Sequence, residues 1–354
     1  MKTCKALMFL LCALFLTVGV FAGGSSAKSG NSASRPLRVG MMPSAVGVPV
    51  QYALEHGYFD AEGLKVTPVI FPNGAAINEA VVAGELDVAM SGAATIFALA
   101  TGENKLLADI AASGGMGMWA RSGSPLLSAR GRASEAKGMY GSAELLRGKT
   151  FFGTLGTSSQ FNVLRYIQQF ALTERDINFV HMESSSAAQA FIAGQGDVIA
   201  SMPPYTIQLE AAGAVKICTF EEATGTALYD MMFAPDISIK NRRADLVKFV
   251  RAVERAIEVL GDNQLRHTFT QPWFRSEGRE YTDEALTQEI LDRQYCNRAI
   301  MTGSDYVFGS AMIGYAEYNV SIERLEKEQV EYVRNCFDPS ILEEALGISV
   351  KRPK

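Results

Sequence analysis

The chain has 354 residues, of which 48% are hydrophobic and 20% charged, and its formal net charge is −5. This length and apolar content allow two domains with well-filled cores. A mildly acidic chain lacks the basic surface with which proteins hold nucleic acid or anionic membranes, so we expect neither as a partner. The spacing of its cysteines indicates no metal site, and no cofactor is expected.

The amino-terminal segment has the pattern of a secretory signal peptide. Two lysines precede an apolar run that ends at Phe21, and small residues follow it. This run is short for a membrane span and lacks a basic stop-transfer flank. We predict a signal peptide over 1–22, cleaved near Ala22, and export to the periplasm. Losing both lysines changes the formal charge to −5 − 2 = −7. Residues 23–35, rich in Gly, Ser and Ala, are predicted to be a flexible leader.

Three cysteines remain after that cleavage: Cys218, Cys296 and Cys336. An exported protein can form disulfides, because it folds in an oxidising compartment. Cys296 with Cys336 is the pair to test first for a disulfide. The alternative, three unpaired buried thiols, stays open.

The most informative pattern in the chain occurs twice. The segment from Ala83 to Ser91 resembles the segment from Ala193 to Ser201, and each follows a predicted strand, a polar turn and a short Ala-rich helix. Two copies are too few for a solenoid and indicate two similarly built α/β lobes, with a small ligand in a cleft between them. Asp87 and Asp197 begin the second strand of each copy, and we interpret both as structural.

The remaining elements follow from apolar periodicity and from Gly and Pro positions. Besides the two strands that close the repeat copies, strands are expected at 36–42, 64–71, 106–112, 150–153, 176–181 and 215–220. Helices are expected at 95–99, 161–172, 246–260, 284–293, 305–315 and 322–336. Segments 114–120 and 228–233 are predicted to be crossings between the lobes, and 122–142 a surface excursion. Alternating strands and helices predict mostly parallel sheets covered on both faces.

Several motifs together resemble one known family. They are Glu55-His-Gly-Tyr-Phe-Asp-Ala-Glu-Gly-Leu-Lys-Val66, Asn73-Gly74 with the later Ala83-Gly-Glu-Leu-Asp-Val88, and Leu146-Arg-Gly-Lys-Thr150 followed by Gly156-Thr-Ser-Ser159. As a set they resemble the nitrate/sulfonate/taurine group of periplasmic solute-binding proteins, which are related to binders of thiamine-pyrimidine precursors. The resemblance covers roughly residues 36 to 260. It implies a type II periplasmic binding protein fold, in which two α/β lobes with mixed sheets enclose a ligand cleft.

The same resemblance implies domain boundaries and partners. Lobe I is expected to comprise 36–118 and 232–354, the latter with the C-terminal helices, and lobe II to comprise 119–231. The protein is expected to be a monomer that captures a small sulfonate, nitrate-like or related polar solute by closure of the two lobes. It would then deliver this solute to the permease subunits of an ABC importer in the inner membrane.

Small polar residues follow five of the predicted strands. In open α/β sheets, ligands bind beyond the C-terminal ends of the strands, and helices that begin there add free backbone N–H groups. Such a site suits a sulfonate, carboxylate, nitrate or polar heterocycle. For any single Ser or Thr, a helix cap is the alternative. The predicted ligand-binding residues are Ser44, Asn73, Gly74, Ser91, Gly92, Gly156, Thr157, Ser158, Ser159, Pro203 and Tyr205.

Few cations lie near these strand ends in the sequence, Arg121 and Arg165 being the nearest. This favours a monoanion or a neutral polar solute. The competing class is an enzyme on the same fold, related to a sulfinate desulfinase or a pyrimidine synthase, which needs a nucleophilic Cys or a Cys/His cluster. The cysteines are not clustered, so we expect a non-catalytic binding protein; Cys218 with His181 is the pair that an enzyme would use.

Overall fold

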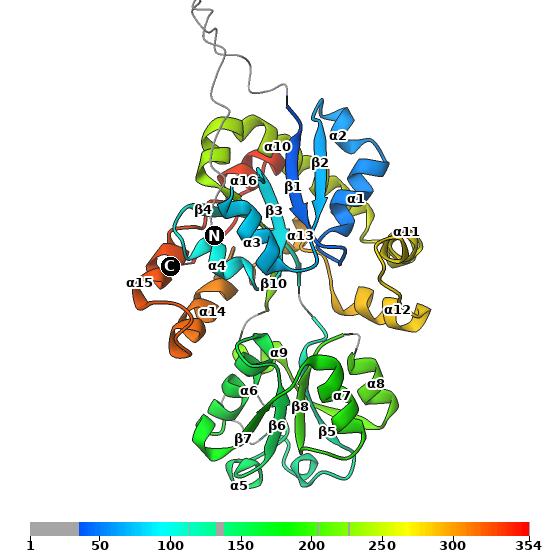
Figure 1. Ribbon diagram of the computed structural model, residues 1–354, viewed down its shortest axis with the longest axis vertical. Coiled ribbons are helices and arrows are strands. Elements are labelled where there is room, and N and C mark those ends of the chain that lie inside the picture. Colours follow the sequence, from blue (N-terminus) through cyan, green and yellow to red (C-terminus); the bar gives the residue numbers. More distant parts are fainter. Residues whose placement is uncertain (1–34, 113, 132–137, 204, 226, 354) are drawn as a thin grey trace, which may run out of the picture. The chain divides into compact units, whose positions relative to one another are not determined.

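The computed structural model describes residues 35–112, 114–131, 138–203, 205–225 and 227–353. The predicted signal peptide, and all of the predicted leader except Arg35, lie outside these residues. The described chain forms two five-stranded mixed sheets with helices packed on them (Figure 1). This confirms the predicted α/β class with two lobes built on mixed sheets. None of the described helices combines the length and the apolar character that a membrane span needs.

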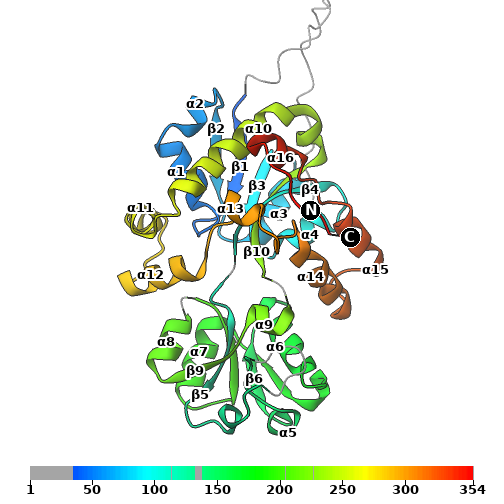
Figure 2. The same cartoon turned by 180° about the vertical axis from the view of Figure 1, so that it is seen from behind.

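Sheet A has the strand order β2-β1-β3-β10-β4. The strands β1, β2 and β3 run parallel, whereas β10 is antiparallel to both of its neighbours. Helices α3 and α4 lie on the face seen in Figure 1, and α10 and α16 on the face seen in Figure 2. The elements are β1 (Leu37–Met41), β2 (Val66–Ile70), α3 (Gly74–Val82), β3 (Val88–Ser91), α4 (Thr95–Leu99), β4 (Asn104–Ala112), β10 (Tyr229–Pro235), α10 (Asp236–Val259) and α16 (Ser340–Leu346).

Sheet B has the strand order β7-β6-β8-β5-β9, with β7, β6 and β8 parallel and β5 antiparallel to β8 and β9. Successive side chains of a strand point to opposite faces. Phe151 accordingly joins a core with α6 on one face, and Phe152 joins a core with α7 and α8 on the other. The elements are β5 (Gly117–Arg121), α5 (Ala143–Leu146), β6 (Thr150–Gly153), α6 (Ser158–Gln168), β7 (Asn178–His181), α7 (Ser184–Ile192), β8 (Val198–Ser201), α8 (Tyr205–Ala211), β9 (Ala214–Thr219) and α9 (Phe220–Thr224).

The remaining helices are mostly beyond α10 and pack around sheet A. Their bounds are α1 (Val48–Glu55), α2 (Tyr58–Ala61), α11 (Asn263–Ser276), α12 (Asp283–Asp292), α13 (Arg298–Met301), α14 (Ser310–Ser321) and α15 (Lys327–Arg334). The helix predicted at 305–315 begins later, because Gly309 before it has a φ of +68°, which is not helical. The helix predicted at 322–336 is likewise shorter, and α11 had no predicted counterpart.

Both predicted crossings contain strands, so each prediction was partly wrong. Residues 117–120 belong to β5 and residues 229–233 to β10. The run from Asp230 to Ala234 is buried, and a buried strand paired on both sides has the same apolar composition as a buried linker. The chain passes from sheet A to sheet B between β4 and β5, and it returns to sheet A between α9 and β10.

Both connections join the ends at which the parallel strands finish. In sheet A, β3 finishes at Ser91, and β4 finishes at Ala112 beside Tyr229, the first residue of β10. In sheet B, Ser201 at the end of β8 pairs with Gly117, the first residue of β5. We call these the carboxyl end of sheet A and the carboxyl end of sheet B. Five Cα steps of roughly 3.6 Å each keep Ala112 and Gly117 within about 18 Å of each other.

The two repeat aspartates tie the strands of each sheet together in the same way. Asp87 accepts a hydrogen bond from Arg38 N at 2.9 Å, and its own N–H donates to Arg38 O at 2.9 Å. Asp197 makes the same pair with Thr150, at 2.9 and 2.8 Å. The surroundings differ, because Asp87 also bonds the guanidinium groups of Arg35, Arg38 and Arg242. Burial alone would raise the pKa of Asp87, but Arg35 and Arg38 hold it well below its ordinary value.

Replacing Asp87 should therefore cost much more stability than the matched change at Asp197. The Asp87 side chain is 3% exposed and that of Asp197 38% exposed. We expect Asp87→Ala to lower the free energy of unfolding by about 3–5 kcal/mol, because it leaves Arg242 buried without this partner. Asp197→Ala should cost about 1 kcal/mol. Urea unfolding of both variants measures the difference, and equal losses would contradict it.

Asp87 should also make the stability of the protein fall at low pH. Because the folded-state pKa of Asp87 is depressed, its contribution to stability is present above the unfolded-state pKa of about 3.9 and is lost as the pH falls further. The wild type should thus lose more stability than Asp87→Ala on acidification below about pH 4.

The possible disulfide between Cys296 and Cys336 is absent, and Cys218, Cys296 and Cys336 are all free and buried, as in the alternative that was left open. Cys336 O accepts a hydrogen bond from Leu106 N, whereas Cys296 N donates to Ile110 O. The two cysteines therefore flank positions four residues apart on β4, which corresponds to about 13 Å. A disulfide needs Cα atoms within roughly 7 Å, so the fold separates this pair.

Thiol titration tests whether the three cysteines are unpaired. The chain beyond residue 22 contains three cysteines, and burial raises the pKa of each thiol. We expect little reaction with a thiol reagent in the native protein, and three thiols per chain after unfolding without a reductant. One thiol per chain would mean that a disulfide has formed.

Candidate functional site

The predicted ligand-binding residues lie at the carboxyl ends of the two sheets. At sheet A, Ser44 is half-buried after β1, and Asn73 caps α3 by accepting a hydrogen bond from Ala76 N at 3.0 Å. Ser91 ends β3, and Gly92 follows it. Asn73 therefore acts as a helix cap.

Gly74 and Ser91 come together although 17 residues separate them. A Cβ atom on Gly74 would lie 2.4 Å from Ser91 Oγ and 2.7 Å from the Cβ atom of Ala94. Only glycine leaves room for the Ser91 hydroxyl at this position. The sequence therefore folds so that the first turn of α3 faces the end of β3, and free N–H groups at that helix end accompany the hydroxyl.

Several buried side-chain atoms near this point have no hydrogen-bond partner among the described residues. They include Ser91 Oγ, Thr95 Oγ1 and Asn78 Oδ1, while Asn78 Nδ2 donates to Ala94 O at 2.8 Å. Ser201 Oγ, at the equivalent position of the second repeat copy, is also buried and unpartnered. Buried hydroxyls almost always have a partner, so these atoms are the ones we expect to bind a polar ligand.

At the carboxyl end of sheet B, the loop after β6 is held by residues far away in sequence. Thr157 caps α6 and accepts a hydrogen bond from Ser159 N at 3.2 Å, so it is a cap, as the alternative proposed. Gly156 N donates to Gln160 Oε1 at 2.8 Å, and Gly156 O accepts from the guanidinium of Arg324. Tyr318 of α14 donates to Gln160 Oε1 at 3.1 Å. Helix α14 therefore contacts this loop.

The other predicted residues of sheet B occupy similar strand ends. Ser158 and Ser159 are buried in the first turn of α6. Pro203 is buried beyond β8, and a Cβ atom on Gly115 would lie 2.7 Å from its Cγ. Tyr205 begins α8 and is half-buried.

Arginines that follow helices α11 and α12 reach the carboxyl end of sheet A. Arg293 Nη1 donates to Asp230 Oδ2 at 2.7 Å, and Asp230 Oδ1 lies 3.0 Å from where Gly92 would carry a Cβ. Arg279 Nη1 donates to Pro43 O, beside Ser44. Burial alone would lower the pKa of Arg293, but Asp230 and Glu289 raise it above its ordinary value. No sequence pattern links these arginines to strands that lie far earlier in the chain.

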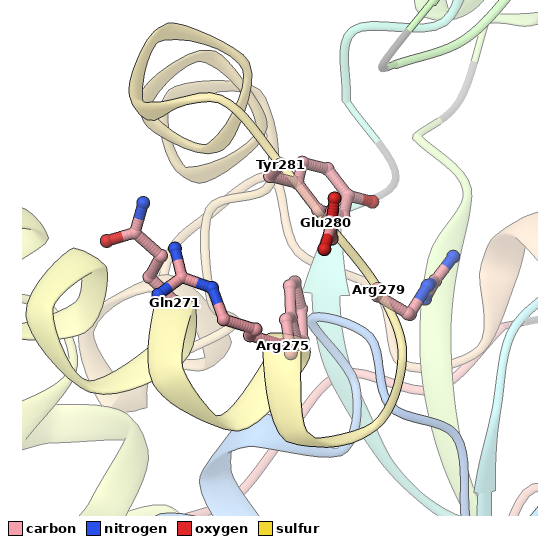
Figure 3. A pocket seen from close by; sticks show the side chains of 6 residues that line it. Gln271, Arg275, Arg279, Glu280 and Tyr281 are labelled. Carbon is pink, nitrogen blue, oxygen red and sulfur yellow. The ribbon is translucent and has the colours of Figure 1, made fainter.

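A small pocket of about 170 Å³ lies where α11 ends (Figure 3). In the view of Figure 3, the side chains of Gln271 and Arg275 lie to the left of Tyr281, and that of Arg279 lies to its right. The residues that line it are Gln271, Phe274, Arg275, Arg279, Glu280 and Tyr281. None of the predicted ligand-binding residues is among them. Arg279 connects this pocket with the carboxyl end of sheet A, because it also donates to Pro43 O.

The pair that an enzyme would use does not come together. His181 ends β7 and Cys218 lies in β9, the two outermost strands of sheet B. Four strand spacings of roughly 4.8 Å put them about 19 Å apart. Burial also raises the pKa of Cys218, which disfavours the thiolate that a nucleophile needs. Within the described ranges, no three His, Cys, Asp or Glu residues gather as metal ligands would.

The sequence of the chain is similar to that of known proteins. A model of the NMT1-like family matches residues 30–271. A protein of Brachyspira hyodysenteriae named as an ABC transporter periplasmic binding protein is 28% identical over 350 residues, or 98% of this chain and 99% of that protein.

Two solved structures share the fold at lower identity. The periplasmic aliphatic sulphonate binding protein SsuA from Escherichia coli has a TM-score of 0.64 and 17% identity, covering 84% of this chain and 91% of that chain. The periplasmic nitrate-binding protein NrtA from Synechocystis PCC 6803 has a TM-score of 0.59 and 11% identity, covering 88% of each chain.

The unpartnered serines allow a test in which stability and binding change in opposite directions. A buried hydroxyl without a partner costs about 1–3 kcal/mol. Ser91→Ala and Ser201→Ala should therefore leave the free energy of unfolding unchanged or raise it by up to about 1 kcal/mol, while they weaken solute binding. As a control, Ser142→Ala removes the cap of α5 and should cost about 1 kcal/mol of stability without affecting binding. Lower stability with unchanged binding for the two serine variants would mean that they serve only the fold.

Proposed function

Because the chain belongs to the NMT1-like family, we propose that it is the extracytoplasmic solute-binding component of an ABC importer. The observation that carries the proposal is the pair of repeat serines. Ser91 and Ser201 end equivalent strands, and each has a buried hydroxyl without a partner among the residues that the structure describes. Both connections between the sheets join the two carboxyl ends that bear these serines. A small solute bound between these ends would satisfy both hydroxyls.

The proposed solute is a small sulfonate, a nitrate-like ion or a related polar molecule. Hydroxyl donors, free N–H groups of α3 and the guanidinium of Arg293 suit a ligand with several acceptor oxygens. The relatives whose names mention sulphonate and nitrate support this class. We propose no catalysis, because the nucleophile pair that the sequence allowed is separated by the width of sheet B.

The proposal also assigns a location and partners. The signal-like amino terminus and the periplasmic relative support a periplasmic protein. We propose in addition that it works as a monomer. Closure of lobe I, which is built on sheet A, on lobe II, which is built on sheet B, would capture the solute, with both connections as hinges. The closed protein would then dock on the permease subunits of the importer.

A ligand panel tests this function. The purified protein is heated with taurine, alkane- and arylsulfonates, nitrate, bicarbonate, carboxylates and pyrimidines. A ligand at about 100 times its dissociation constant should add roughly 2.7 kcal/mol of stability, which appears as a higher unfolding temperature. Ser91→Ala should reduce that shift.

Recovery of the ligand after incubation separates binding from catalysis. We expect each stabilising compound to be recovered unchanged. Conversion of any member of the panel, without a stabilising shift, would replace the binding role with an enzymatic one.

A further inference from the structure

Arg293 is fixed at the carboxyl end of sheet A by its own backbone. The chain after α12 runs beside the end of β4, where Ala112 N donates to Gln294 O at 2.8 Å and Ala111 forms a bridge with Tyr295. Arg266, which is buried, donates to Arg293 O at 2.7 Å. These contacts leave the Arg293 side chain little freedom to move away.

Buried carboxylates orient the guanidinium group of Arg293. Nη1 donates to Asp230 at 2.7 Å, and Nε lies 4.0 Å from Glu289, too far for a hydrogen bond. Nε is itself buried and without a partner among the described residues. The side chain as a whole is 18% exposed, so part of it reaches the surface. A guanidinium has five N–H donors, and one of them is used by Asp230.

Asp230 connects Arg293 to the segment that follows β3. Asp230 lies between Arg293 and Gly92, and Gly92 follows the unpartnered hydroxyl of Ser91. Gly92 O accepts from Thr95 N at 3.0 Å, and the hydroxyl of Thr95 is also unpartnered. A fixed cation next to unused donors favours an oxyanion over a neutral molecule of the same shape.

We propose that Arg293, held by Asp230, is the residue that makes this site select a negatively charged solute over its neutral analogue. This inference rests on the proposed solute-binding function and deepens it. Arg293 acts as the specificity-determining residue, and Asp230 as a positioning residue that keeps the guanidinium at the carboxyl end of sheet A.

Matched ligand pairs test the selection of charge. Ethanesulfonate is compared with ethanesulfonamide, and propionate with propionamide, by calorimetric titration of the purified protein. The wild type should prefer the charged member of at least one pair. Arg293→Met should weaken binding of that anion by about 10- to 100-fold and bring the ratio of the two affinities close to one. Arg293→Lys, which keeps the charge, should retain the preference for the anion.

Two further variants control for charge elsewhere and for folding. Arg275→Met removes an exposed arginine of α11 (Figure 3) and should change the anion affinity by less than about twofold. If Arg293→Met fails to fold, the double variant Arg293→Gln with Asp230→Asn removes the ion pair as a whole. It should fold and should also lose the preference for the anion. Circular dichroism and the unfolding temperature of each variant verify the fold.

The outcomes distinguish this inference from the function on which it rests. If neither the matched pairs nor the wider panel binds to the wild type, the proposed solute-binding function fails. If the wild type binds only neutral molecules, or a folded variant without Arg293 keeps the wild-type ratio, this inference is wrong while solute binding stands. Loss of the preference in that variant, with the preference retained in Arg275→Met, supports it.

Discussion

The polarity of the parallel strands is the constraint on which the rest of the structure depends. Three parallel strands in each sheet must finish at one end, and the antiparallel strands β5 and β10 begin at those same ends. Residues distant in sequence, such as Gly74 and Ser91, thereby meet. The aspartates at the opposite ends of β3 and β8 hold the strands in register, which keeps the loops at the carboxyl ends in place.

The charge of the candidate site has a different origin. The repeat contributes small residues, hydroxyls and helix N–H groups, but no cation. Arg279 and Arg293 come from chain beyond residue 260, outside the repeat. Asp230 and Glu289 keep the buried Arg293 charged, and Asp230 orients it, at the cost of two carboxylates removed from water. The scaffold and the charge at the site are thus separate contributions from two parts of the chain.

Much of the fold could be predicted, because repeated strand-helix-strand patterns bury one face and depend mainly on local periodicity. The family resemblance drawn from Asn73-Gly74 and the Gly-Lys motif is confirmed by the family match. Predictions failed where two structures share one composition. The run at 229–233 was predicted to be a crossing and is a buried strand. The prediction failed because the sequence of a strand does not reveal which strands pair with it.

The candidate site was predicted only in part, for the same reason. The strand ends were located correctly in the fold, but whether Ser91 or Thr157 serves a ligand or a helix depends on its neighbours. The distance between Cys296 and Cys336 likewise depends on where each crosses β4. Neither the role of such a hydroxyl nor the distance between two cysteines can be inferred from the neighbouring sequence.

The sequence by itself determined the two-lobe α/β plan, the repeat and the loops at the strand ends, because hydrophobic periodicity and turn residues act over short stretches of chain. Only the tertiary structure decided which of those loops face one another and which hydroxyls stay unpartnered. It also decided that Arg293 stands beside Asp230. The pair of Arg293 and Asp230 joins residues 63 positions apart, and such a contact arises only when the helices and sheets pack.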